Sequence, residues 1–69
     1  MLGKVRNFNN AKGYGFIFVP DLKINIFCHY TSILDEGYKS LVEGEEVEIE
    51  SVEESAKGKF AIGVKKINA

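Results

Sequence analysis

The fold is decided by two stretches, YGFIFV at residues 14–19 and INIFCHY at residues 24–30. Both are rich in aromatic and β-branched side chains, which favour β-strands. Pro20 and Asp21 between them form a turn signal, because proline cannot donate a hydrogen bond to a sheet. The sequence therefore predicts two strands joined by a short hairpin, followed by one helical turn at residues 31–34.

Outward from this hairpin, the hydrophobic pattern has a period of two rather than that of a helix. It predicts further strands at residues 4–8, 45–52 and 60–67. In the second of these, Val47 and Ile49 alternate with glutamates, which is typical of a strand with one wet face. Short strands without a long helix predict one all-β domain, a small barrel or sandwich, that spans all 69 residues.

Alternation along the two decisive strands divides their side chains into two sets. The small aliphatic set suits the cramped interior of a barrel and comprises Ile17, Val19, Ile26 and Cys28. The opposite set, which we predict to face outward, comprises Tyr14, Phe16, Phe18, Phe27 and His29. The reverse arrangement, with the rings in the core and the aliphatic residues exposed, stays open at this point.

A cluster of exposed rings is uncommon on a monomer and often marks an interaction site. Gly13 and Gly15 beside the rings lack side-chain bulk and so allow another molecule to approach closely. Lys4, Arg6 and Lys12 lie nearby in the sequence. Rings interleaved with cations match nucleobases and their phosphates, and a duplex hides the faces of its bases. The residues therefore predict binding of a single-stranded nucleic acid.

Charge is segregated along the chain although the net charge is only −1. Residues 1–30 carry +3, residues 31–56 carry −8, and residues 57–69 carry +4. If the two basic ends meet in space, they form a positive face for a polyanion, and an acidic face limits indiscriminate binding. The alternative is that these are ordinary solvated charges that keep a small protein soluble.

Two motifs in this order resemble the ribonucleoprotein motifs of the cold-shock domain family, namely KGYGFI at residues 12–17 and IFCHY at residues 26–30. The segments GKVRNFN at 3–9 and EGYKSL at 36–41 also resemble that family, so the likeness spans nearly the whole chain. The resemblance implies a five-stranded antiparallel barrel of the OB-fold type. It also implies binding of single-stranded RNA or DNA, without catalysis or cofactor, by RNA chaperones that can influence transcription and translation.

Carried over position by position, the resemblance assigns base stacking to Tyr14, Phe16, Phe27, His29, Tyr30 and Tyr38. It assigns polar or phosphate contacts to Lys4, Arg6, Lys12 and Lys39. Tyr30 presents a conflict, because strict alternation turns this side chain inward. A strand end or a bulge would reconcile the two assignments.

The chain departs from the family at Asn7, where the family usually has tryptophan, so the binding surface is reduced or shifted. Phe18 stands where the family commonly has an acidic residue, and Phe60 lies near a position that is usually polar. We expect Asn7 to stay within the binding surface and Phe18 or Phe60 to replace part of the missing ring. Alternatively, Phe60 joins Ile62 and Val64 on a core-facing side of the last strand.

Other functions find less support in the residues. His29 has no identifiable nucleophile or paired carboxylate beside it, and one cysteine with one histidine does not form a zinc site, so we expect no enzyme, metal or cofactor. We expect no membrane segment, no small-molecule substrate, a cytoplasmic location and a monomer, with a dimer as the alternative. The competing function is a protein-interaction module on the same barrel, with nucleic-acid binding weakened by Asn7.

Overall fold

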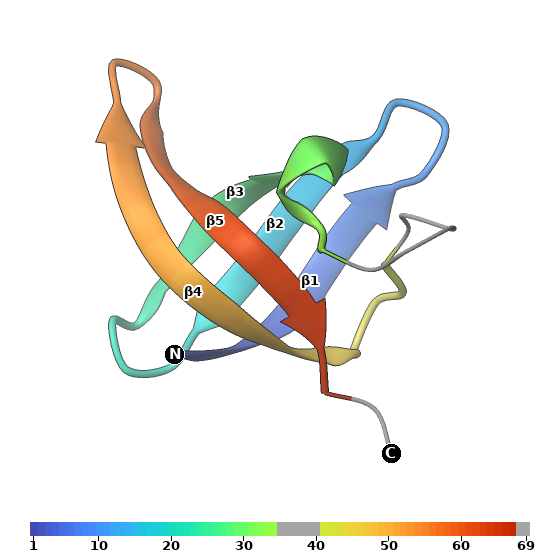
Figure 1. Cartoon of the computed structure of the whole chain (residues 1–69), viewed down its shortest axis with the longest axis horizontal. Helices are drawn as coiled ribbons and strands as arrows, with labels where there is room; N and C mark the ends of the chain where they lie inside the picture. The colour runs from blue at the N-terminus through green and yellow to red at the C-terminus, as the bar shows by residue number, and fades with distance from the viewer. Residues whose placement is uncertain (35–40, 68–69) are drawn as a thin grey trace.

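The computed structural model describes residues 1–34 and 41–67 (Figure 1). Its elements are β1 (Leu2–Asn9), β2 (Tyr14–Val19), β3 (Ile24–His29), the 3₁₀ helix η1 (Tyr30–Ser32), β4 (Glu46–Ser55) and β5 (Gly58–Lys66). Every predicted strand is present. β4 runs further than predicted because it pairs with β5 as far as Ser55 opposite Gly58. The helical turn begins at Tyr30, directly after β3, rather than at the predicted Thr31.

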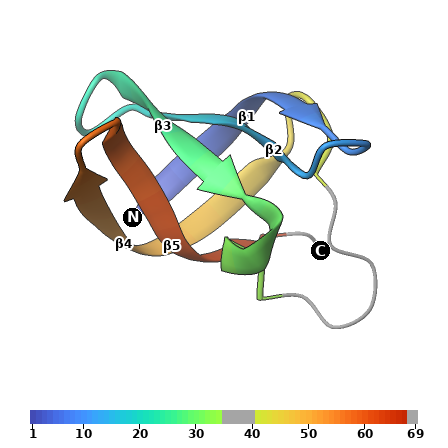
Figure 2. The same ribbon diagram turned by 90° about the horizontal axis from the view of Figure 1, so that it is seen from above.

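The strands close into a barrel in the order β1-β2-β3-β5-β4. The β4–β5 ribbon crosses one side of the barrel, and β1, β2 and β3 form the other side (Figures 1 and 2). All neighbouring strands are antiparallel except β3 and β5, which pair in parallel where Phe27 lies beside Phe60. The expected antiparallel arrangement therefore holds except at this closing pair. Closure gives each strand a neighbour on both sides and so limits the exposed strand edges at which sheets associate.

The barrel interior contains aliphatic side chains, as the alternation predicts. The four predicted interior residues, Ile17, Val19, Ile26 and Cys28, are each 0% exposed. They form one cluster with Val5, Ile33, Leu41, Val47, Ile49, Ala61 and Val64. The arrangement with rings in the core is thereby excluded. Full burial of such a valine, leucine or isoleucine side chain contributes about 1.5–3 kcal/mol, so this cluster is the main source of stability.

A β-bulge at Arg6 determines which side chains of β1 face outward. Asn7, rather than Arg6, lies opposite Phe16 in β2. The extra residue reverses the alternation that follows, so Asn7 is exposed and Phe8 packs against the core. Gly15 lies against the backbone of Asn7 and Phe8, where any β-carbon would overlap those atoms. Glycine at this position therefore allows β1 and β2 to come close enough for the bulge.

A second irregularity, at Gly63 in β5, determines the position of Phe60. Gly63 has a φ of 70°, a left-handed conformation that L side chains rarely adopt. Ala61 is buried before it and Val64 after it, whereas Phe60 and Ile62 are half-buried. The three residues Phe60, Ile62 and Val64 consequently do not share a core face, and that alternative is wrong. Phe60 instead lies beside Phe27 on the outer side.

Candidate nucleic-acid interface

The register of β1, β2, β3 and β5 arranges their outer side chains in three rows. The middle row contains Asn7, Phe16, Phe27 and Phe60. The row on one side contains Asn9, Tyr14 and His29. The row on the other side contains Lys4, Phe18 and Asn25. Residues distant in the sequence therefore meet on a single surface, on which every row contains a ring and has an amide or a lysine at its β1 end.

Phe27 lies at the centre of the ring cluster. Its ring centroid is 5.7 Å from that of Tyr14, 5.9 Å from Phe16 and 6.5 Å from His29. The His29 ring in turn lies 4.6 Å from that of Tyr30. Aromatic pairs at such distances contribute about 0.5–1.5 kcal/mol beyond their buried area. The rings hold one another in place, which lowers the entropy cost of binding a ligand.

The rings face solvent to different degrees. The exposed fractions of Tyr14, Phe16 and Tyr30 are 37%, 41% and 43%. The half-buried rings are Phe18, Phe27, His29 and Phe60. The predicted outward orientation is thus confirmed. Tyr30 is exposed although alternation turns it inward, because β3 ends at His29 and the chain enters η1.

Local hydrogen bonds fix the two rings at the end of β3. The His29 Nδ1 lies 3.0 Å from the hydroxyl oxygen of Thr31 and accepts from the Thr31 backbone N–H at 3.4 Å. The Tyr30 backbone N–H donates to the Gly13 carbonyl oxygen at 2.8 Å. Gly13 has a φ of 81°, and a β-carbon there would collide with the Tyr30 ring. The glycine in the first loop therefore leaves room for the tyrosine ring after β3.

An open groove of about 510 Å³ lies between β3 and the β4–β5 hairpin. Phe16, Phe27 and Phe60 line it together with Lys57 and Lys59, and we call it the aromatic groove. The two lysines bring positive charge beside the rings, and the Lys59 ammonium also lies 3.7 Å from a Glu54 carboxylate oxygen. These lysines are not among the site residues predicted from the sequence. They could have been found from their closeness to Phe60 at the start of the predicted last strand.

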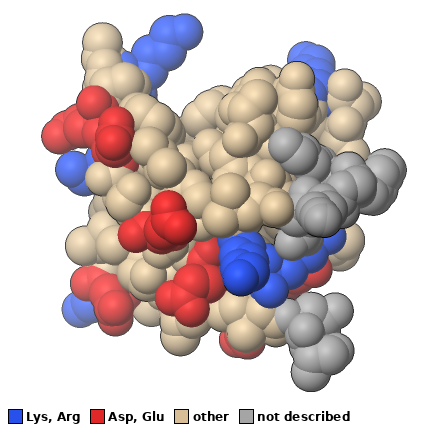
Figure 3. Space-filling view, viewed as in Figure 1, with Lys and Arg blue, Asp and Glu red and all other residues tan. Residues whose placement is uncertain are grey.

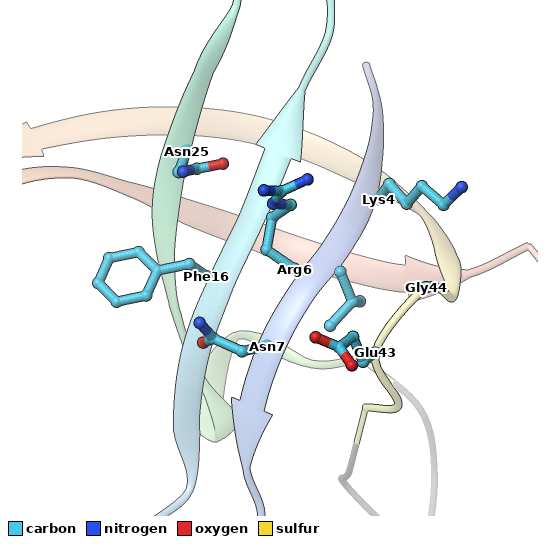
Figure 4. Close-up of a pocket in the computed structure, with 8 residues that line it drawn as sticks. Lys4, Arg6, Asn7, Phe16, Asn25, Glu43 and Gly44 are labelled. Carbon is cyan, nitrogen blue, oxygen red and sulfur yellow. The ribbon is translucent and has the colours of Figure 1, made fainter.

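A second hollow, of about 690 Å³, lies on the β1 side of Phe16. Its polar lining consists of Lys4, Arg6, Asn7, Asn25 and Glu43, and we call it the polar hollow (Figure 4). Phe16 and Asn25 also line the aromatic groove, so the two depressions adjoin each other. Asn25 was not predicted as a site residue, although alternation places it on the same face as Phe27.

The β4–β5 side of the barrel has a different surface. Its visible face carries acidic and basic groups near one another rather than a single-sign patch (Figure 3). In the register of this ribbon, Lys65 lies opposite Glu48, and Lys59 lies opposite Glu54. The basic C-terminal segment is therefore divided: Lys57 and Lys59 reach the aromatic groove, whereas Lys65 lies among the glutamates of β4.

Comparison with known proteins connects this geometry to a family. The 'Cold-shock' DNA-binding domain matches residues 1–67. This chain belongs to the cold-shock domain family. It is 55% identical to cold shock protein CspB of Geobacillus stearothermophilus over 51 residues, covering 74% of this chain and 76% of that protein. It is 42% identical over 62 residues to cold shock-like protein CspC of Buchnera aphidicola, covering 90% of this chain and 88% of that protein.

A solved structure supports the fold. The drosophila Unr CSD456 structure aligns with 97% of this chain at a TM-score of 0.78 and 24% identity. This chain spans about a quarter, 26%, of that longer protein. The barrel is consistent with the OB-fold, and the family identifies a nucleic-acid-binding cold-shock protein; these matches indicate no enzyme family.

The remaining predicted site residues of this cold-shock domain line neither depression or lie outside the described residues. Lys12 lies exposed in the loop between β1 and β2, and its backbone N–H donates to the Asn9 side-chain oxygen at 3.0 Å. Phe18 is on the ring-bearing face, but it lines neither the aromatic groove nor the polar hollow. Tyr38 and Lys39 lie outside the described residues.

Cys28 lies on the inner side of β3, behind the rings. Its thiol is free and fully buried, and burial raises its pKa to about 11. Within residues 1–34 and 41–67, no group of three or more histidine, cysteine or acidic side chains is arranged to hold a metal ion. Over the same residues, no helix is long and apolar enough to cross a membrane.

Proposed function

We propose that this cold-shock protein binds single-stranded RNA or DNA by stacking bases on the rings around Phe27. The observation that carries the proposal is the ring contact of Phe27 with Tyr14, Phe16 and His29 on a solvent-facing surface. A base stacked on such a ring contributes about 1–3 kcal/mol. Every base has a flat face, so this contribution tolerates many sequences.

Cations around the rings supply the second part of the binding energy. Lys57 and Lys59 line the aromatic groove, and Lys4 and Arg6 line the polar hollow. A phosphodiester backbone that follows the row of rings releases counterions as the lysines neutralise its phosphates, and Arg6 offers a polar contact beside it. Lys12, which is close to the rings in the sequence, belongs to the same proposed surface, and family resemblance adds Tyr38 and Lys39.

We infer that Phe60 replaces part of the stacking area lost with tryptophan at position 7. Phe60 lies beside Phe27 and lines the aromatic groove with it. Phe18 lies in the row next to that of Phe27, opposite Asn25 rather than another ring. The geometry therefore favours Phe60 over Phe18 for this role.

Binding of this kind has a consequence for RNA structure. A ring that covers a base face competes with base pairing and with stacking inside a duplex, so bound strands stay unpaired. We therefore propose an RNA chaperone or a regulator of transcription or translation. We propose that it acts in the cytoplasm, where a lone cysteine without a disulfide is usual, and as a monomer, because each strand of the barrel pairs with a neighbour on both sides.

A fluorescence titration tests the proposal with oligothymidine and a duplex of equal length. We expect micromolar or tighter binding to the single strand and much weaker binding to the duplex. Phe27→Ala should weaken single-strand binding by about tenfold or more, which corresponds to about 1.4 kcal/mol. Ile67→Ala is the matched control, because Ile67 is 45% exposed but follows the distal end of β5. Absence of single-strand binding at low salt would contradict the proposal and favour a protein-interaction module.

A further inference from the structure

The polar hollow contains side chains whose hydrogen-bonding groups have no partner within the protein. Among the described residues, the amides of Asn7 and Asn25 and the guanidinium of Arg6 form no hydrogen bond or ion pair. Two neighbouring asparagines differ: the Asn9 side chain accepts from the Lys12 N–H at 3.0 Å, and the Asn10 amide donates to the Leu41 carbonyl oxygen at 3.4 Å. Asn9 and Asn10 thus have a structural role in their loop, which Asn7 and Asn25 lack.

The position of these groups relates them to a stacked base. Asn7 on β1 and Asn25 on β3 lie on either side of Phe16, and Arg6 lies between them (Figure 4). The bulge at Arg6 is what brings Asn7 opposite Phe16. Phe16 also lines the aromatic groove, so a strand that stacks there continues directly into the polar hollow.

The polar hollow combines cationic, amide and carboxylate groups, so it offers both hydrogen-bond donors and acceptors to the edge of a base. Glu43 contributes a carboxylate to the same lining as Lys4 and Arg6. A carboxylate repels a phosphate but accepts hydrogen bonds from the amino groups of bases. The side chains therefore suit the polar edge of a base, with the phosphates passing outside.

The combination of amide and guanidinium groups points to a purine. On its Hoogsteen edge, each purine carries an N7 acceptor next to either an amino group or a carbonyl oxygen, whereas the same edge of a pyrimidine has a carbon atom in that place. Asparagine matches the N6 and N7 of adenine, and arginine matches the O6 and N7 of guanine. Unpaired bases in single strands expose these edges to side chains.

We propose that the polar hollow is a purine-selective subsite in which Asn7, Asn25 and Arg6 read the N7 edge of one base. This inference rests on the proposed single-strand binding and adds base selectivity at one position of the bound strand. The rest of the strand, stacked on the rings, remains sequence-tolerant. The replacement of tryptophan by Asn7 thereby exchanges a stacking surface for a hydrogen-bonding one.

The test is a titration series with eight-nucleotide oligothymidine strands in which one thymine at a time is replaced by adenine or guanine. We expect one position at which a purine tightens binding by about tenfold. Replacement of that purine by its 7-deaza analogue should abolish the gain, because the analogue keeps its stacking face and loses the N7 acceptor. This arm uses the unmodified protein, so it does not depend on the folding of any variant.

Protein variants then identify the residues that read the base. In Asn7→Leu and Asn25→Leu, which retain side-chain size, the ratio of purine to thymine affinity should fall to near one. Each ratio is taken within one variant, so a general loss of affinity does not affect it. Ser51 is exposed on β4, across the barrel from β2 and β3. Ser51→Ala should therefore retain the ratio of purine to thymine affinity of the unmodified protein.

The outcomes separate the two proposals. Oligothymidine binding without a purine-preferring position, or a preference that persists with the 7-deaza base or in both leucine variants, would overturn the purine subsite alone. Failure of the protein to bind any of the single strands would overturn the proposed function and the subsite together.

Discussion

β2 and β4 have the same kind of inner face and opposite outer faces. Ile17 and Val19 on β2, and Val47 and Ile49 on β4, are all fully buried. Outside, β2 presents Tyr14, Phe16 and Phe18, whereas β4 presents Glu46, Glu48 and Glu50. The inner residues of a strand thus determine whether the barrel forms, and the outer residues determine what it binds. A small domain can therefore change its ligand without changing its core.

The largest expected effect tests the shared inner face. Ile17→Ala on β2 and Ile49→Ala on β4 should each lower the free energy of unfolding by about 2–5 kcal/mol, because each leaves a cavity in the same cluster. Urea denaturation followed by circular dichroism measures both values. If only the β2 variant loses stability, the two inner faces are not equivalent and the comparison fails.

An intermediate effect tests how far the stacking surface extends from Phe27. Phe60→Ala should weaken binding to oligothymidine by about fivefold, the lower end of the range for one stacked base. Phe18→Ala should change the affinity by less than about twofold, because Phe18 lines neither depression. Titration of both variants under identical salt compares the two rings directly. A larger loss in Phe18→Ala would shift the proposed surface toward Lys4 and Asn25.

The smallest expected effect concerns charge at the edge of the aromatic groove. Lys57→Gln combined with Lys59→Gln should reduce the slope of log affinity against log salt by about 0.7 for each lysine that contacts a phosphate. We expect the double variant to lower the slope by somewhat less than twice that amount, because the Lys59 ammonium already lies near the Glu54 carboxylate. Lys65→Gln, opposite Glu48, is the matched control on the same strand. An equal change of slope in the control would mean that general charge, rather than the groove, produces the effect.

Much of the proposed binding surface follows from alternation alone. Alternation correctly predicts that Phe16 and Phe27 face outward and that Ile17 and Ile26 face inward. It succeeds because β2 and β3 are regular strands that pair without a bulge. Tyr30 was assigned by resemblance and against alternation. Its exposure follows from the end of β3, which the sequence did not place at His29.

The remaining features depend on backbone irregularities and long-range pairing, which leave little trace in a single sequence. The bulge at Arg6 determines the direction of Asn7, and the positive φ of Gly63 determines which residues of β5 face the core. Phe60 reaches the rings only through the parallel pairing of β5 with β3. Asn25 and Lys57 were overlooked because their roles depend on the depressions that this closure creates.

Burial protects the Cys28 thiol, which lies behind the proposed binding face, from oxidants. Peroxides react with a thiolate, and a thiol with a pKa of about 11 is almost wholly protonated at neutral pH. Cys28 is the only cysteine of the chain, and it lies directly behind Phe27 and His29. Under oxidising conditions this thiol would therefore stay unmodified for as long as the barrel stays closed.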